Sequence, residues 1–546
     1  MLQPVFAESY RIAYEDAEGH AHEVQGALGG QGLMQAGDMA ESPYGLLEVR
    51  AEVGEGIISL SAVALAPIRL TSCTVSLHRR FDPGERIVIN GYQSWTDTHE
   101  LSPDSTMRGI NRVPNQLVGR FALDGSGDYR FVEYDEQPGH LHGFTYATIR
   151  HGDDMQLIAS LDERRGFTLV SMNCDEALVE LQTECPIREI ASGEEIVLGR
   201  YLIAQGGEDE VFDRWFSLMG VTPRPSAPLI GYTSWYRHYD DIDENKILSD
   251  LDAAAASLEE IDAPGAQRVF QIDDGFAKVG DWLFVDPDDF PRGLAPIAQR
   301  AADLGFMPGL WLAPFVCEHD SDIFRLRPEW LLRDEEGDPV TTGSHWSGGY
   351  ALDTLNPEFR EYITTVIQMA VLVWGFRLLK LDFLYAACMI PHGGMNRGEL
   401  MADGVRLLRE AAGDDCMILG CGVPLAPAFG EFEYCRIGCD VGLDWDGPAP
   451  MRLLHRERVS TRDSLHNTLG REPLDGRAFR NDPDVFFLRD DIRLTRSQRM
   501  MLLEEDAVNA SVLLTSDDMS TWSVLDREAY QSAIATMLAR DGRMGR

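Results

Sequence analysis

The 546 residues are more than one ordinary hydrophobic core supports, so two or three domains are expected. Hydrophobic residues make up 44% and charged residues 25% of the chain, which is typical of a globular protein. The 89 acidic residues outnumber the 48 basic ones, and the formal net charge of −41 opposes binding to nucleic acid or to anionic membrane surfaces. A neutral small-molecule substrate fits this charge better than an anionic one.

The N-terminus has no basic segment followed by an apolar one, and the most apolar run, 369–376, is too short to span a bilayer. Nine cysteines, an odd number, favour reduced thiols over a disulfide framework. Neither a Cys-x-x-Cys pair nor a histidine at ligand spacing accompanies the five cysteines between Cys388 and Cys439. We therefore expect a cytoplasmic protein without a metal site or other cofactor.

Residues 1–225 are predicted to form an N-terminal β-sandwich domain. Runs with alternating apolar residues, separated by turn residues, occur at 56–65, 68–78, 129–134, 155–161 and 167–172. The first long helix is expected over 208–219. The segment VTPRPSAP (221–228), with three prolines, marks the boundary of the domain.

From residue 226 to residue 546, strand-like segments alternate with segments of helical periodicity. Eight strands are predicted at 229–235, 268–276, 306–314, 376–384, 417–422, 434–440, 484–489 and 511–518, and helices at 242–258, 294–304, 357–373 and 397–412. This count predicts a catalytic (β/α)8 TIM barrel. A doubly wound open sheet is the alternative, but no glycine-rich phosphate loop supports it.

In such barrels the functional site lies at the carboxyl ends of the strands. Polar or aromatic residues end most of the predicted strands: Trp235; Asp273 and Asp274; Trp311; Lys380 and Asp382; Cys421; Arg436 and Asp440; Asp517 and Asp518. In FRLLKLDFL (376–384), Lys380 and Asp382 share one strand face, and a cation beside a carboxylate keeps it ionised, as a nucleophile requires. A strand-end ion pair would explain these two residues alone, but polar residues at so many strand ends favour a site.

Carboxylates and tryptophans together suit a sugar, because indole rings stack on a pyranose and carboxylates accept hydrogen bonds from its hydroxyls. Glycoside hydrolysis needs one ionised carboxylate and one proton donor, roughly 5–5.5 Å apart in retaining enzymes. Asp382 suits the first role. Asp440, which follows the apolar YCRIGC, suits the second, although Arg436 would oppose a raised pKa there.

Eight stretches between residues 91 and 489 carry a resemblance to a known family: GYQSW (91–95), GYTSWY (231–236), QIDDGF (271–276), GLWLAP (309–314), LLKLDFL (378–384), GCGVPL (420–425), CRIGCD (435–440) and NDPDVFFLR (481–489). The chain resembles glycoside hydrolase family 36, the group that contains microbial α-galactosidases. The resemblance implies a retaining α-galactosidase that needs no cofactor and acts on small oligosaccharides.

The same resemblance implies a role for each candidate residue. Asp382 would be the nucleophile, and Asp440 the general acid and base. The substrate-binding residues would be Trp95, Trp235, Asp273, Asp274, Trp311, Lys380, Cys421 and Arg436. Trp95 would reach over the mouth from outside the barrel, and a core tryptophan is the alternative for this residue.

Two departures from the family and several alternative functions remain open. The stretch 385–394 and the long loop 316–351, which contains Trp330 and Trp346, are not matched to the family and are expected to shape the aglycone side. Members commonly carry a β-domain after the barrel, whereas here 529–540 predicts a single closing helix, so that domain is expected to be absent or vestigial. The alternatives are a β-L-arabinopyranosidase, an α-galactosyl transglycosylase of the raffinose-synthase type, and a catalytically silent sugar-binding protein. A lyase or a metal-dependent hydrolase on the same barrel is a further one.

Overall fold

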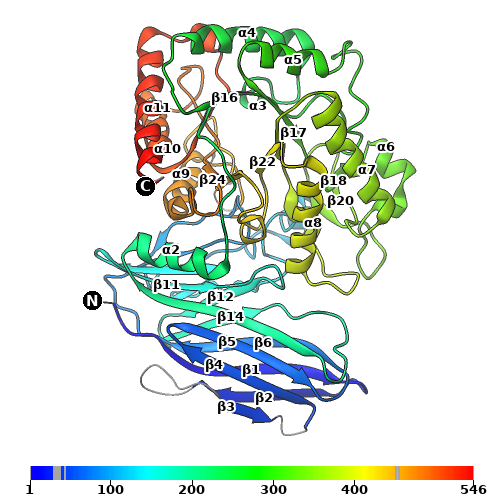
Figure 1. The fold of residues 1–546 in the computed structure, drawn as a ribbon, viewed down its shortest axis with the longest axis vertical. Coiled ribbons are helices and arrows are strands. Elements are labelled where there is room, and N and C mark those ends of the chain that lie inside the picture. Colours follow the sequence, from blue (N-terminus) through cyan, green and yellow to red (C-terminus); the bar gives the residue numbers. More distant parts are fainter. Residues whose placement is uncertain (1, 29–37, 42–44, 449–451, 453–454, 545–546) are drawn as a thin grey trace.

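The computed structural model describes residues 2–28, 38–41, 45–448, 452 and 455–544. The residues up to Gly206 form two antiparallel sheets, seen at the bottom of Figure 1. In sheet order, the first contains β2 (Ala21–Ala27), β1 (Phe6–Asp16), β6 (Ile68–His78), β13 (Leu178–Thr183), β12 (Thr168–Asn173) and β9 (His140–Phe144). The second contains β3 (Asp38–Glu41), β4 (Leu47–Gly54), β5 (Ile57–Ala64), β14 (Glu195–Gly206), β11 (Asp154–Ser160), β10 (Tyr146–His151), β7 (Arg86–Ile89) and β8 (Glu100–Leu101).

These two sheets share a hydrophobic core of their own. Alternate residues point inward, as in β5, where Ile58, Leu60 and Ala62 are buried, and they meet side chains of the other sheet such as Ile12 and Val75. The predicted β-rich N-terminal part is therefore confirmed, and four of its five predicted strands are present.

The predicted strand at 129–134 is wrong. Two backbone N–H groups, those of Phe131 and Val132, donate to the carbonyl of Asp128 and make a turn instead. Tyr134 donates from its hydroxyl to Asp128 at 2.6 Å, and Tyr129 donates to Glu457 at 2.9 Å. The tyrosines that resemble a strand pattern are thus held by side-chain hydrogen bonds, one within the turn and one to Glu457, far away in the sequence.

A nine-stranded parallel sheet occupies the second part of the chain. Its order is β24 (Arg480–Asp482), β23 (Tyr434–Arg436), β22 (Met417–Gly420), β21 (Leu378–Leu381), β17 (Met307–Leu312), β16 (Gln267–Ile272), β15 (Leu229–Thr233), β26 (Val512–Thr515) and β25 (Val485–Phe486). The two end strands, β24 and β25, are separated only by Pro483 and Asp484. Because two residues span at most about 7 Å, the end of β24 lies close to the start of β25.

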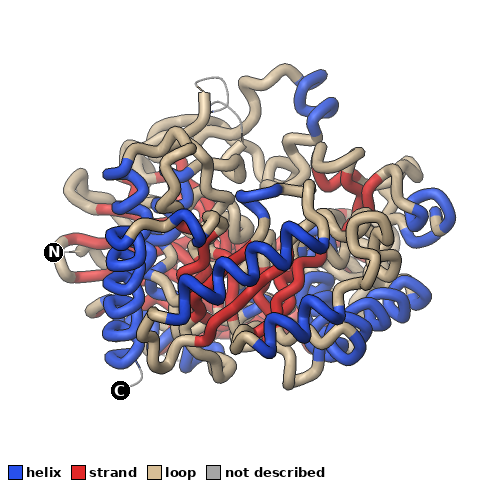
Figure 2. Tube along the Cα trace, turned by 90° about the horizontal axis from the view of Figure 1, so that it is seen from above, coloured by secondary structure: helices blue, strands red, loops and turns tan. Residues whose placement is uncertain are grey.

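Helices connect the parallel strands and lie around them in Figures 1 and 2. In chain order they are α3 (Trp235–His238), α4 (Glu244–Glu259), α5 (Ala295–Asp303), α6 (Asp322–Leu326), α7 (Pro357–Gln368), α8 (Arg397–Ala412), α9 (Thr461–Gly470), α10 (Arg496–Asn509) and α11 (Val524–Met544). The short α1 (Asn115–Phe121) precedes the parallel sheet in the chain, as does the predicted helix α2 (Glu208–Met219). A small sheet of β18 (Val316–Glu318), β20 (Gly349–Ala351) and β19 (Thr341–Gly343) extends the loop after β17.

Two further predictions, a closing helix near the C-terminus and free cysteine thiols, can be compared with the structure. The closing helix predicted over 529–540 lies inside α11, and all nine cysteines are free thiols. Among the described residues, none of the helices is both long and apolar enough to cross a membrane.

Candidate active site

The carboxyl end of β16 carries an aspartate bound to a buried lysine. Asp273 Oδ2 accepts hydrogen bonds from Lys380 Nζ at 3.0 Å and from Gln271 Nε2 at 2.7 Å. Burial lowers the pKa of Lys380, but the carboxylates of Asp273 and then Asp382 outweigh it, and the net shift is upward. The sequence predicts an ion pair of Lys380 with Asp382, but its partner is Asp273, because the long lysine side chain reaches past β17 to the end of β16.

Asp382 follows β21 and is held by two N–H donors. Trp311 donates from its indole Nε1 to Oδ2 at 3.0 Å, and the backbone N–H of Phe383 donates to Oδ1 at 2.8 Å. The buried thiol of Cys421 lies beside this carboxylate, and burial and the charge of Asp382 raise the pKa of the thiol. Each oxygen of Asp382 therefore has a donor that fixes its direction.

Asp440 and Asp484 share the guanidinium of Arg436. Arg436 Nη2 lies 2.9 Å from Asp440 Oδ1 and 3.3 Å from Asp484 Oδ2. The two carboxylates differ in exposure, because the Asp440 side chain is 38% exposed and that of Asp484 only 6%. Burial raises the pKa of Asp484 to about 7 against the effect of Arg436, and the hydroxyl of Tyr236 donates to the same carboxyl group. Asp440 is the member of this group that an incoming molecule can reach.

His345 lies near both candidate catalytic carboxylates. Its side chain is exposed, yet desolvation by the surrounding protein lowers its pKa, while the negative charges of Asp440 and Asp382 act in the opposite direction. The two carboxylates, which follow different strands, β23 and β21, thus both act on one side chain.

Aromatic rings form one wall of this region. Trp95, from the loop after β7, donates from Nε1 to Cys421 Sγ at 3.3 Å, and its ring lies edge-on to that of Phe383, with centroids 5.0 Å apart. A Cβ atom on Gly422 would lie 2.9 Å from the Trp95 ring, so only glycine permits this contact. Trp95 is therefore buried at the junction of the two parts of the chain, directly beside Cys421.

A second wall is built by the loop between β19 and β20. Trp346 donates from Nε1 to Asp274 Oδ2 at 2.7 Å, and its ring centroid lies 4.9 Å from that of Phe383. Burial raises the pKa of Asp274 to about 7, although the Trp346 hydrogen bond opposes this shift. Asp274 and Trp346 also line a cleft of about 590 Å³, which continues away from Asp382 along Asp240 and Glu318.

Trp235 and four residues outside the predicted set remain to be placed. Trp235 lies in α3, half-buried, with its ring against Tyr239, while the neighbouring Tyr236 donates a hydrogen bond to Asp484, and the sugar-binding role of Trp235 stays a prediction. The sequence assigns no role to Tyr236, His345 and Asp484, and it places Trp346 only in a loop expected to shape the aglycone side. Asp484 could have been found, because the Asp-Pro-Asp run in NDPDVFFLR interrupts an otherwise strand-like segment.

Two further strand-end residues named from the sequence have structural partners. Asp517 accepts hydrogen bonds from the backbone N–H groups of Leu488 and Arg489 and from the indole of Trp522. Asp518 lies 2.8 Å from Arg237. They stabilise the connection around β26.

A family model described as Melibiase matches residues 226–392, and the E. coli α-galactosidase is 36% identical over 149 residues, or 26% of this chain and 19% of its own length. An α-galactosidase from Thermus thermophilus, solved with p-nitrophenyl α-D-galactopyranoside, is 28% identical with a TM-score of 0.70, over 90% of this chain and 92% of that one. These similarities support membership of glycoside hydrolase family 36.

The share of each relative's chain that the similarity covers differs between the solved structures and the curated sequences. The family 36 α-galactosidase AgaA of Geobacillus stearothermophilus shares 12% identity and a TM-score of 0.58 over 99% of this chain and 74% of its own, which shows a common fold. The alignments span only 19%, 15% and 18% of the length of the first three curated relatives. The solved family members have an N-terminal β domain followed by a barrel-like catalytic domain, and this chain likewise has a β-rich part followed by a parallel sheet surrounded by helices.

The buried pair of Lys380 and Asp273 gives the first prediction. Lys380→Met leaves the Asp273 carboxylate buried without its cation, which costs about 3–5 kcal/mol, so the melting temperature falls by several degrees. The double variant Lys380→Met/Asp273→Asn recovers most of this loss, because no unpaired charge is then buried. Differential scanning calorimetry at pH 7 measures both. The exposed Lys246→Met, which breaks an ion pair with Asp241, is the control, and an equal loss in this variant would contradict the interpretation.

Proposed function

We propose that the chain is a retaining α-galactosidase that hydrolyses terminal α-D-galactosidic bonds of oligosaccharides by double displacement. The observation that carries the proposal is Asp382, with one N–H donor on each carboxylate oxygen and with Asp440 near the same imidazole, that of His345. The Thermus thermophilus relative, solved with an α-galactoside and also with stachyose, supports this substrate class. The curated relatives are α-galactosidases, so nothing favours the alternatives raised from the sequence.

In the first step Asp382 attacks the anomeric carbon while Asp440 gives a proton to the leaving oxygen. The glycosidic C–O bond breaks as the bond to Asp382 forms, and the leaving alcohol departs neutral. In the second step Asp440, now ionised, takes a proton from water, whose oxygen attacks the same carbon and releases Asp382. Asp440 suits this exchange, because its 38% exposed side chain is within reach of both the leaving group and water.

The remaining predicted residues hold the sugar in this proposal. The carboxylates of Asp273 and Asp274 accept hydrogen bonds from sugar hydroxyls, while Lys380 and Arg436 donate to them. Trp95, Trp235 and Trp311 cover the apolar face of the ring, and Cys421 closes the space beside Asp382. No cofactor is required, because the proton transfers and the nucleophile all come from side chains.

The proposal also covers the architecture and the location of the protein. We take residues 1–225 as a β-sandwich domain and residues 226–546 as the catalytic domain. The adjacency of β24 and β25 supports a closed (β/α)8 barrel, whose seventh strand is interrupted at Pro483 and Asp484. Nine free thiols favour a reducing compartment such as the cytoplasm.

The nucleophile is tested with Asp382→Gly. Hydrolysis of p-nitrophenyl α-D-galactopyranoside falls at least about a thousandfold, because no carboxylate remains to form the glycosyl-enzyme. Added azide enters the vacated space and restores release of nitrophenol, with β-galactosyl azide as the product by NMR. Asp518→Gly, an aspartate that follows another strand, retains activity and is the control. Undiminished hydrolysis by Asp382→Gly would overturn the proposal.

The acid–base role of Asp440 is tested by the leaving group. In Asp440→Ala the rate on stachyose falls about 10²–10⁴-fold, because its leaving sugar must be protonated. The first step with p-nitrophenyl α-D-galactopyranoside is affected much less, since nitrophenolate leaves without a proton. The ratio of kcat/KM for the two substrates measures the effect, and an equal loss on both would remove Asp440 from this role.

The raised pKa of Asp274 predicts that substrate binding depends on pH. Its pKa of about 7, raised by burial, means that the carboxyl group takes up a proton as the pH falls from 8 to 6 and loses an acceptor for a sugar hydroxyl. The KM of the wild type then rises roughly tenfold over this range. In Asp274→Asn the KM is higher at pH 8 and nearly constant. Steady-state kinetics give both profiles, and a wild-type slope that persists in Asp274→Asn would refute the assignment.

A further inference from the structure

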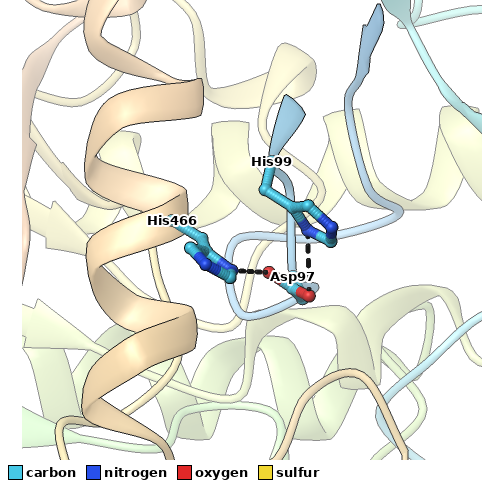
Figure 3. Close-up of side chains that lie close together, drawn as sticks. All are labelled: Asp97, His99 and His466. Carbon is cyan, nitrogen blue, oxygen red and sulfur yellow. Dashed lines mark ion pairs between the residues drawn. The ribbon is translucent and has the colours of Figure 1, made fainter. Parts of the chain in front are cut away.

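A cluster of two histidines and one aspartate lies where the β-rich part of the chain meets helix α9 (Figure 3). Asp97 and His99 come from the loop that leads into β8, and His466 comes from α9. The Nδ1 atom of His99 is 3.1 Å from Asp97 Oδ2, and the Nδ1 atom of His466 is 3.4 Å from Asp97 Oδ1. Residues far apart in the sequence thus bring three potential ligand atoms within 4.8 Å of one another.

The polar atoms of this cluster are buried without hydrogen bonds. His99 Nδ1, His466 Nδ1 and Asp97 Oδ1 are inaccessible to solvent and have no hydrogen-bond partner among the described residues. The short distances between them therefore do not correspond to well-directed hydrogen bonds. Buried polar atoms normally have a hydrogen-bond partner, and a buried polar atom without one needs an explanation, such as a bound ion.

We propose that Asp97, His99 and His466 form a binding site for a divalent transition-metal ion such as Zn²⁺. Two imidazole nitrogens and one carboxylate oxygen are ligands that zinc prefers, at about 2.0–2.2 Å, and two ligands of a tetrahedral ion then lie about 3.3 Å apart. His99 Nδ1 and His466 Nδ1 lie 3.1 and 3.4 Å from different oxygens of Asp97, and the three potential ligand atoms, within 4.8 Å of one another, would draw together around the ion. The ion would satisfy the buried nitrogens and the free carboxylate oxygen together.

A cavity beside the cluster provides the fourth ligand and an entry path. His99 and His466 line a cavity of about 490 Å³, together with Tyr146 and Glu208. Water from this space completes the tetrahedron. The side chains of His99 and His466 are 36% and 34% exposed, so an ion can reach the site without unfolding of the protein.

The ion would fasten the loop that carries Trp95 onto α9. Thr98, between the two loop ligands, already donates from its backbone N–H to Asn467 Oδ1 at 2.7 Å, next to His466. A metal bond on either side of this hydrogen bond holds the loop in one position. The site is therefore structural, it shares no residue with the site of Asp382 and Asp440, and it does not depend on the proposed hydrolase activity.

Metal binding is tested on the full chain without a histidine tag, after treatment with EDTA and buffer exchange. Titration with Zn²⁺, read by isothermal calorimetry and by elemental analysis after desalting, gives one ion per chain. Co²⁺ as a probe gives visible d–d bands typical of a tetrahedral site. Zn²⁺ also raises the melting temperature of the wild type, because it binds the folded state.

His99→Gln and His466→Gln lose the bound ion and the cobalt bands, and Zn²⁺ no longer raises their melting temperature. The matched control is His20→Gln, which removes a histidine from the exposed group of Asp16, Glu18 and His20 and leaves binding unchanged. Two results would overturn the proposal: less than about one tenth of an ion per wild-type chain, or undiminished binding in both His99→Gln and His466→Gln. Circular dichroism of each variant shows that it is folded, so a loss of binding reports on the ligands.

Discussion

Excess negative charge at the carboxyl ends of the parallel strands is the constraint on which the site depends. Two cations, Lys380 and Arg436, lie among six carboxyl groups: Asp273, Asp274, Asp382, Asp440, Asp482 and Asp484. Burial of so many charges is costly unless some are neutralised. Burial raises the pKa values of Asp274, Asp482 and Asp484, which favours their neutral forms relative to an exposed carboxyl group. The surplus that remains suits the proposed reaction, because the transition state of glycoside hydrolysis carries positive charge on the sugar ring.

Backbone strain is concentrated in the same place. Phe383, Trp346 and Asp484 have positive φ angles of 55°, 52° and 87°, which non-glycine residues rarely adopt and which cost of order 1–3 kcal/mol each. Each conformation directs a group into the site. Phe383 turns its N–H toward the Asp382 carboxylate, Trp346 reaches Asp274, and Asp484 receives the N–H of Val441 at 2.9 Å. The folded core around the strands therefore stabilises local geometries that serve the site rather than the fold.

Strand-end residues could be predicted because parallel strands place their carboxyl ends at one edge, so Asp273, Lys380, Asp382 and Asp440 are identifiable from position alone. The residues with which they pair could not be predicted. The pairing of Lys380 with Asp273 depends on the reach of a lysine past one strand, and spacing along a single strand suggests Asp382 instead. His345 and Trp346 come from a long loop without periodicity, so no pattern indicates that they meet the strand ends. The wrong strand at 129–134 has the same cause, since its tyrosines bond to residues that only the tertiary structure brings near.

Both parts of the chain contribute to the site, and one buried arginine, Arg471, holds them together. Arg471, which follows α9, donates to the carbonyl groups of Ser94 and Gln93 in the Trp95 loop and to that of Ile437 in the segment before Asp440. Burial lowers its pKa to about 10, so the guanidinium still carries its charge at neutral pH, where it keeps these three carbonyls in place. The indole of Trp95 is thereby fixed against Cys421, which in turn lies beside Asp382. The β-rich part is thus a structural component of the site, because the wall next to the proposed nucleophile is formed from its loop.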